Sequence, residues 1–192
     1  MATNIYKINF DTEHFRTLKC IDPVPENHFL INARSREEGW KTVNLAWENE
    51  DKPEADFSLL SPNAFVVKES IKEILLKKFY FHAEYLPVNV GANDYYIINF
   101  RNCAPALNLE KSKLIRSKET NEITSIKKYS FLVNRLTPGT VFKIVEMKGM
   151  ETFCYQYCLD IDQEFIFGYE QRYKWSGLLF ERVFSFARPR LR

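Results

Sequence analysis

The sequence predicts an α+β domain built mainly on an antiparallel sheet. Aromatic residues make up 15% of the 192 residues, with 16 Phe and 10 Tyr, and such rings favour strands. β-rich runs dominate the chain, and its two helical patterns do not alternate with them as β-α-β units require. Because 45% of the residues are apolar, a chain of this length can bury a core without disulfide or metal staples.

Two segments show helical patterns. Residues 65–79 place apolar side chains on one face and charged side chains largely elsewhere, which predicts an amphipathic helix. The apolar face holds Val67, Ile71, Ile74, Leu75 and Phe79. A second, short helix is predicted near residues 169–175.

The clearest strand signal is a hairpin. Residues 83–90 and 95–100 are β-rich and flank a Gly-Ala-Asn-Asp turn at residues 91–94. Pro87 has no backbone N–H, so it is expected at a sheet edge or a bulge. Further strands are predicted at residues 28–33, 113–116, 123–132, 141–147, 151–161, 164–167 and 178–186.

The pattern of the chain changes near residue 60. Residues 1–60 hold short apolar runs between polar loops and are predicted to be a variable region that packs on, or extends, the main domain. Residues 61–187 form that main domain, and residues 188–192 form a basic tail. Within the first region, Trp47–Asp56 carries five acids and Pro53, which predicts an exposed loop.

Composition narrows the function classes. The net charge of +2 gives no whole-chain electrostatic footprint for nucleic acid. The N-terminus lacks the pattern of a secretory signal, and no stretch of 18 apolar residues occurs, so a cytoplasmic protein without a membrane span is expected. The four cysteines are then expected to be free thiols.

No set of residues completes a catalytic or metal site. Cys154 and Cys158 are four residues apart, but no second pair of ligands accompanies them, and Gly-rich phosphate loops are absent. We therefore expect no enzyme activity, no metal and no cofactor. Two enzyme alternatives remain open: a hydrolase that uses Cys20 with a nearby histidine, and a nuclease that uses Asp160, Asp162 and Glu164.

Nucleic-acid binding is a further alternative. Residues Lys111–Lys128 are rich in lysine and arginine, and Tyr129 and Phe131 beside them could form a stacking platform for bases. Because acids interrupt the basic residues, as they do in ordinary polar hairpins, nucleic acid is not the partner that we favour.

Protein binding has a positive signal in the acidic segment. Interfaces favour Trp anchors, and an acidic patch speeds the encounter with a basic partner. The segment places Trp47 beside dense negative charge, and Trp40 lies seven residues upstream. The candidate partner-binding residues are therefore Trp40, Trp47, Glu48, Glu50 and Asp51.

A series of short motifs follows in order from about residue 65 to residue 185. They are a helix ending near Phe79, Leu86-Pro87-Val88, Tyr95–Asn99, Ala106–Ser112, Phe142-Lys143-Ile144, Phe165-Ile166-Phe167 and Gly177–Phe180. In this order they resemble a bacterial immunity-protein family associated with polymorphic toxin systems. One position departs from the family, which has an Asp where this chain has Asn108. A charged role would be lost there, whereas a turn or capping role would survive.

The resemblance implies a cytoplasmic antidote that binds and neutralises a cognate toxin, such as the C-terminal domain of a secreted effector. It supplies no catalytic residues, and its shared motifs are structural. Specificity for the toxin is then expected in the variable surface, which includes the acidic segment before residue 60.

Overall fold

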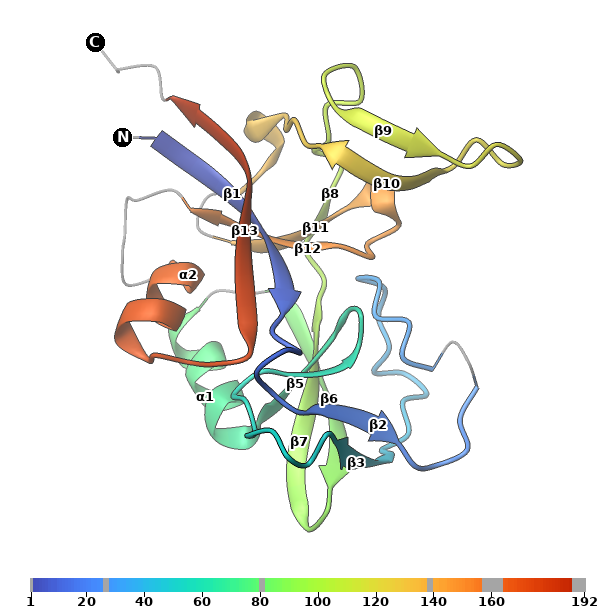
Figure 1. The fold of residues 1–192 in the computed structure, drawn as a ribbon, viewed down its shortest axis with the longest axis vertical. Helices are drawn as coiled ribbons and strands as arrows, with labels where there is room; N and C mark the ends of the chain where they lie inside the picture. Colours follow the sequence, from blue (N-terminus) through green and yellow to red (C-terminus); the bar gives the residue numbers. More distant parts are fainter. Residues whose placement is uncertain (1, 26–27, 80–81, 138–139, 157–163, 188–192) are drawn as a thin grey trace.

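The computed structural model in Figure 1 describes residues 2–25, 28–79, 82–137, 140–156 and 164–187. Its strands form a five-stranded sheet, a six-stranded sheet and a separate hairpin. The described strand pairs are antiparallel except β11 with β8 and β3 with β6. The sheet-dominated α+β character predicted from the sequence is therefore confirmed.

Each sheet draws its strands from distant parts of the chain. The five-stranded sheet runs in the order β13 (Leu178–Ala187), β1 (Ala2–Phe10), β12 (Thr152–Gln156), β11 (Val141–Ile144), β8 (Cys103–Ala104). The six-stranded sheet runs in the order β2 (Thr17–Cys20), β3 (Asn44–Glu48), β6 (Ala83–Val90), β7 (Asn93–Phe100), β5 (Ala64–Lys68), β4 (Ser58–Ser61). The hairpin pairs β9 (Lys113–Arg116) with β10 (Ile123–Lys128). Strands from both sides of residue 60 thus share each main sheet, and the proposed boundary stays a prediction.

The amphipathic helix is shorter than predicted. Helix α1 spans Glu69–Lys78, and the residues before it form β5, which pairs with β7. Residues 64–67 form a strand because alternate side chains are buried on its two faces. Phe65 and Val67 pack into one core, and Ala64 and Val66 pack into another. The apolar periodicity of residues 65–79 therefore ran across a strand-to-helix boundary.

The second helical segment begins earlier than predicted. Phe165–Phe167 forms α2 and Gly168–Arg172 continues as a π-helical turn, so the strand predicted at residues 164–167 is wrong. Phe165, Ile166 and Tyr169 all pack into the core beside α1. Helical spacing brings these three side chains to one side, which strand geometry would not do. The described helices include none long and apolar enough to cross a membrane.

The predicted hairpin at residues 83–100 is confirmed. β6 pairs with β7 along its whole length, and Gly91 in the connecting turn has a φ of 61°. Pro87 lies where β6 is an edge, as expected, because β3 pairs only with Asn89 and Val90. The Pro87 carbonyl on that open stretch accepts a hydrogen bond from Trp40 Nε1 at 2.9 Å.

The remaining strand predictions are mixed. Strands occur at residues 113–116, 123–128, 141–144, 152–156 and 178–187, close to the predicted ranges. The 28–33 segment is a series of turns instead, and residues 145–147 form a 3₁₀ turn, η2 (Val145–Met147). Residues 157–163, the predicted end of one strand, and the tail 188–192 lie outside the described residues. Asn108 Oδ1 accepts a hydrogen bond from the Lys111 N–H at 3.2 Å, which is a turn role.

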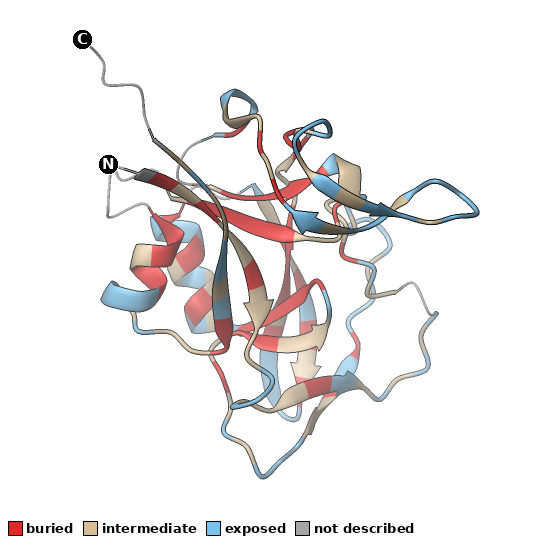
Figure 2. Cartoon of the chain, turned by 45° about the horizontal axis from the view of Figure 1, so that its top comes forward, coloured by how far each residue is buried: buried red, intermediate tan, exposed pale blue. Residues whose placement is uncertain are grey.

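The described residues form three apolar cores that hold the sheets together. Figure 2 shows that buried residues run through the central strands of the five-stranded and the six-stranded sheet. The first core lies between the two sheets and the helices. The second core covers the opposite face of the five-stranded sheet, and the third covers the opposite face of the six-stranded sheet. A bulge in β13 lets Phe180 join the first core and Phe184 the second, although both are even-numbered positions.

Candidate partner-binding surface

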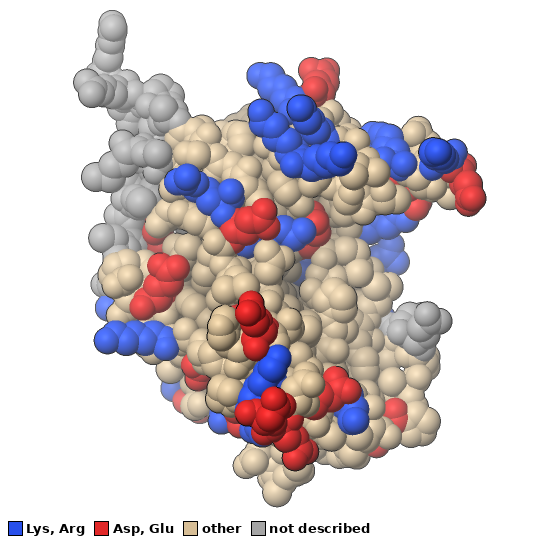
Figure 3. Space-filling model, viewed as in Figure 1, with Lys and Arg blue, Asp and Glu red and all other residues tan. Residues whose placement is uncertain are grey.

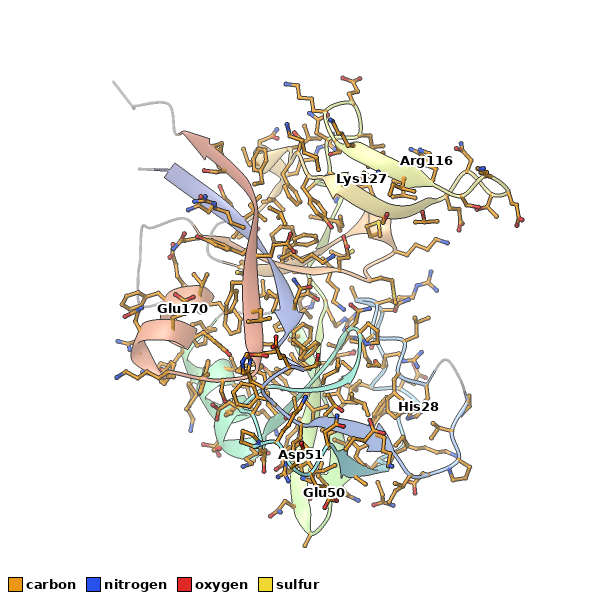
Figure 4. The ribbon with its side chains drawn as sticks, viewed as in Figure 1. His28, Glu50, Asp51, Arg116, Lys127 and Glu170 are labelled. Atoms are coloured by element: carbon orange, nitrogen blue, oxygen red, sulfur yellow. The ribbon has the colours of Figure 1, made fainter. Side chains whose placement is uncertain are left out.

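An acidic turn follows β3. Glu48 ends the strand, Asn49 takes a φ of 56°, and the Lys52 N–H closes the turn on the Asn49 carbonyl at 2.9 Å. Glu50 and Asp51 are exposed on this turn. We call Glu48, Glu50 and Asp51 the acidic turn. Figure 3 shows acidic side chains gathered at this end of the molecule, and Figure 4 labels Glu50 and Asp51 there.

The acidic turn is held in place by Glu54. Its carboxylate accepts hydrogen bonds from Arg16 Nη2 at 2.8 Å and the Tyr95 hydroxyl at 2.7 Å, and it pairs with Lys68 Nζ at 2.6 Å. Burial alone would raise the pKa of Glu54, but the hydrogen bonds from Lys68, Tyr95 and Arg16 outweigh it and lower that pKa. Strands β5 and β7 and the segment before β2 are thus tied to one carboxylate, which fixes the chain just after the acidic turn.

Trp47 packs against the residues that surround Glu54 and does not lie in an exposed loop. It lies on β3, where its ring is half-buried, and the Arg16 guanidinium carbon sits 4.0 Å from the ring centroid. The Tyr95 ring meets it edge-on at 6.2 Å between centroids. Because Ala55 is also buried, the prediction of an exposed loop over Trp47–Asp56 holds only for its central part.

Trp40 is engaged elsewhere. Besides its hydrogen bond to Pro87, its ring stacks on His28 with centroids 4.6 Å apart and meets Phe29 edge-on. The structure brings Trp47, Glu48, Glu50 and Asp51 together along one strand and turn. The hydrogen bond and ring contacts of the Trp40 side chain are instead with β6 and with His28 and Phe29.

Arg16, Lys68 and Tyr95 were missed as parts of this site. They come from three separate stretches of the chain, and nothing in their local sequence marks them as partners of Glu54. Only the register of the six-stranded sheet and the docking of the 11–17 segment bring them together, for example through the Arg16 N–H, which donates to the Pro53 carbonyl at 3.1 Å.

The residues considered for catalysis are not assembled in the described part of the chain. The Cys20 thiol donates weakly to the Asp22 carbonyl at 3.5 Å, His14 pairs with Asp11, and His28 stacks on Trp40. Cys158, Asp160 and Asp162 lie outside the described residues, and Glu164 is buried. The described residues hold no cluster of three or more His, Cys, Asp or Glu arranged to bind a metal ion.

Tyr129 and Phe131 are not a stacking platform for bases. Both are buried in the second core, where their rings stack on each other with an interplanar angle of 4°. The Tyr129 hydroxyl donates to Glu151 at 3.0 Å, and burial together with the Glu151 charge raises the pKa of Tyr129. The sequence interpretation of these two rings is therefore wrong.

Lys143 on β11 is a buried cation far from the acidic turn. Its side chain is 0% exposed, and Nζ donates to the Ile31 carbonyl at 2.6 Å. Burial lowers the pKa of Lys143 to about 8, against a weaker opposing effect of Cys103. The ammonium thus ties the turns after residue 28 to the five-stranded sheet.

The pKa of Lys143 predicts a rise in stability with pH. An unfolded lysine keeps its proton up to 10.5, whereas folded Lys143 loses it near pH 8. Between these values the unfolded chain binds more protons, so the free energy of unfolding gains up to about 3 kcal/mol as pH rises. Urea unfolding of wild type and Lys143→Met at pH 7 and pH 10 measures this contribution. Tyrosines and cysteines titrate in both proteins, so their effect cancels when the free energy of unfolding of the variant is subtracted from that of wild type. A difference that stays constant with pH would contradict the prediction.

Comparison with known proteins finds no family model and no curated protein that matches the chain. Evidence on function therefore comes from the residues and contacts of the chain itself.

Proposed function

We propose that this protein is an immunity protein that binds a cognate bacterial toxin and blocks it. The observation that carries the proposal is the acidic turn, in which Glu50 and Asp51 are exposed while hydrogen bonds from Arg16 and Tyr95 to Glu54 fix the chain beside them. The order of short motifs that resembles the immunity-protein family supports the same assignment. On this proposal the protein acts in the cytoplasm by binding alone, without a cofactor or a catalytic residue of its own.

A preformed acidic turn suits a basic target. Charges on a surface that is already ordered steer a partner of opposite sign, and a turn that is already formed loses less conformational entropy on binding than a disordered loop would. A toxin that cleaves nucleic acid has a basic substrate cleft, which makes it a matching target for Glu48, Glu50 and Asp51. On this proposal Trp47 supports the acidic turn indirectly, because its half-buried ring packs against Arg16 and holds β3 in place.

Protection is the first test of this function. We expect the neighbouring upstream gene to encode a large secreted protein whose C-terminal domain is the toxin. Expression of that domain in a host cell should arrest growth, and co-expression of this chain should restore it. Growth arrest that persists despite soluble, folded protein would overturn the proposal.

Charge reversal tests the role of the acidic turn. The triple variant Glu48→Lys, Glu50→Lys and Asp51→Lys is expected to slow association with the toxin about tenfold or more at low salt. The salt dependence of association should flatten as well. Stopped-flow or surface-plasmon measurements over a range of salt concentrations give both quantities.

A matched variant separates the turn from net charge. Glu37, Glu38 and Glu119 are exposed acids outside the turn. Reversing these three changes the net charge by the same amount and is expected to leave the association rate within about twofold of wild type, because steering depends on charges near the interface. Equal slowing by both triple variants would remove the acidic turn from the interface while leaving the immunity function itself standing.

A further inference from the structure

The β9–β10 hairpin stands apart from both main sheets. It forms its own two-stranded sheet, and Figure 1 shows it extending from one side of the molecule. Leu114 and Ile126 lie opposite each other and pack against the second core, which fixes the inner face of the hairpin. Because side chains alternate along a strand, Lys113 and Ile115 point outward.

The outer face is basic. Lys113 lies directly opposite Lys128, and Ile115 lies opposite Ser125, with Lys127 exposed at the adjoining bulge. Figure 3 shows basic side chains gathered over this hairpin, away from the acidic turn, and Figure 4 labels Arg116 and Lys127 on its two strands. The molecule therefore has a basic and an acidic region, although its net charge is only +2.

These lysines have no acidic partners in the described part of the chain. The ion pairs found there include none for Lys111, Lys113, Lys127 or Lys128. Of the acids at the tip, Glu122 pairs with Lys148 beyond η2 at 2.8 Å. Like charges placed directly opposite each other on a ribbon are destabilising, so the Lys113–Lys128 pair favours a bound anion.

We propose that the outer face of the β9–β10 hairpin binds double-stranded DNA of B form, with the ribbon lying in the major groove. That groove is about 12 Å wide and admits a two-stranded ribbon. Lysines on both strands then face the two rows of phosphates that border the groove, while Ile115 and Ser125 face the base edges. This activity is separate from the proposed toxin binding, which uses the acidic turn at the other end of the molecule.

The same features disfavour other partners. Bases of a single strand need exposed rings to stack on, and Tyr129 and Phe131 are buried. The major groove of duplex RNA is too narrow and deep for side chains to read. An acidic peptide presents one row of charge, whereas the lysines of the hairpin lie in two rows, with Lys113 on β9 and Lys127 and Lys128 on β10.

The test measures binding of a fluorescently labelled DNA duplex of about 24 base pairs by anisotropy, starting near 50 mM salt. We expect wild-type binding that weakens steeply with salt. The double variant Lys113→Ala, Lys128→Ala should bind about tenfold or more weakly, and its log–log salt slope should be smaller in magnitude by about 2. Because the variant removes a repulsive pair, its thermal unfolding midpoint should equal or exceed that of wild type.

The matched control is Lys41→Ala, Lys78→Ala. Both lysines are exposed and lie outside the hairpin, so this variant changes the net charge equally and should retain wild-type affinity and salt slope. The proposal is overturned by absence of salt-sensitive duplex binding, by equal losses in both double variants, or by single-stranded DNA or duplex RNA binding as tightly as duplex DNA. Polyglutamate binding through Lys113 and Lys128 without duplex binding would assign the surface to an acidic protein instead.

Discussion

Replacement of Glu84 by leucine is expected to lower the free energy of unfolding by about 3–5 kcal/mol. The Glu84 side chain is 4% exposed, and its carboxylate accepts hydrogen bonds from four donors. They are Ser35 Oγ, the Arg36 N–H, Asn99 Nδ2 and Arg101 Nη1. Leucine fills the space but removes the charged acceptor that these donors share, and the loss of buried hydrogen bonds to a charged group is expensive. Asn99 Nδ2 keeps its second hydrogen bond, to the Arg34 carbonyl at 2.7 Å. Urea unfolding at pH 7 measures the loss.

A surface pair on α1 provides the matched control. Glu73 pairs with Lys77 at 2.9 Å, but their side chains are 54% and 68% exposed. Glu73→Leu removes the same kind of ion pair in water and should cost less than about 1 kcal/mol. Equal losses in the two variants would show that the Glu84 network contributes no more than a surface contact.

Acid should weaken the Glu84 contribution. Burial by itself raises the pKa of Glu84, but the hydrogen bonds from Ser35, Asn99 and the Arg36 N–H and the charge of Arg101 outweigh it, so the pKa is lowered. The stabilisation is then present above the unfolded pKa of 4.5 and is lost as pH falls through the lower folded value. The difference in stability between wild type and Glu84→Leu should therefore shrink in strong acid.

Replacement of Gly177 by alanine is the second large effect that we expect, at about 3–5 kcal/mol. Gly177 has a φ of 97°, and a Cβ there would lie 2.1 Å from the Phe57 carbonyl oxygen and 2.6 Å from the Ala55 Cβ. Backbone hydrogen bonds hold this contact tightly, since the Phe57 N–H donates to the Ser176 carbonyl and the Asp11 N–H to the Gly177 carbonyl. The added methyl group therefore has no room to relax.

Gly91 separates backbone strain from the clash. Its φ of 61° is also in the left-handed region, but nothing lies within 4 Å of the Cβ that alanine would add. Gly91→Ala should thus cost about 1 kcal/mol. Thermal unfolding of both variants checks the comparison, and a Gly177→Ala variant as stable as Gly91→Ala would contradict the close approach at Phe57.

The sequence predicted those parts of the fold that depend on local preferences. The β6–β7 hairpin needed a turn with Gly91 and two β-rich runs, all of which are adjacent in the chain. The position of Pro87 at an open stretch of β6 followed from its missing N–H. Helix α1 was located but not its start, because the 3.6-residue spacing continued by coincidence into β5.

The candidate site was predicted only in its exposed half. Dense negative charge beside Pro53 marked a solvated segment, and Glu50 and Asp51 are indeed exposed. The packing of Trp47 under Arg16 could not be predicted, because the two residues are brought together by the pairing of β2 with β3. For the same reason Trp40, seven residues from Trp47 in sequence, proved to be engaged with His28 and Pro87.

By itself, the sequence determined that the protein is a sheet-dominated α+β domain with an exposed acidic turn, because hydrophobic pattern, turn chemistry and charge density act over a few neighbouring residues. Only the tertiary structure decided which residues hold that turn, which aromatic rings are buried, and where the lysines of the β9–β10 hairpin gather. Those outcomes depend on contacts between distant segments, such as Glu54 with Arg16, Lys68 and Tyr95, whose energies arise only when folding brings the partners together and removes them from water.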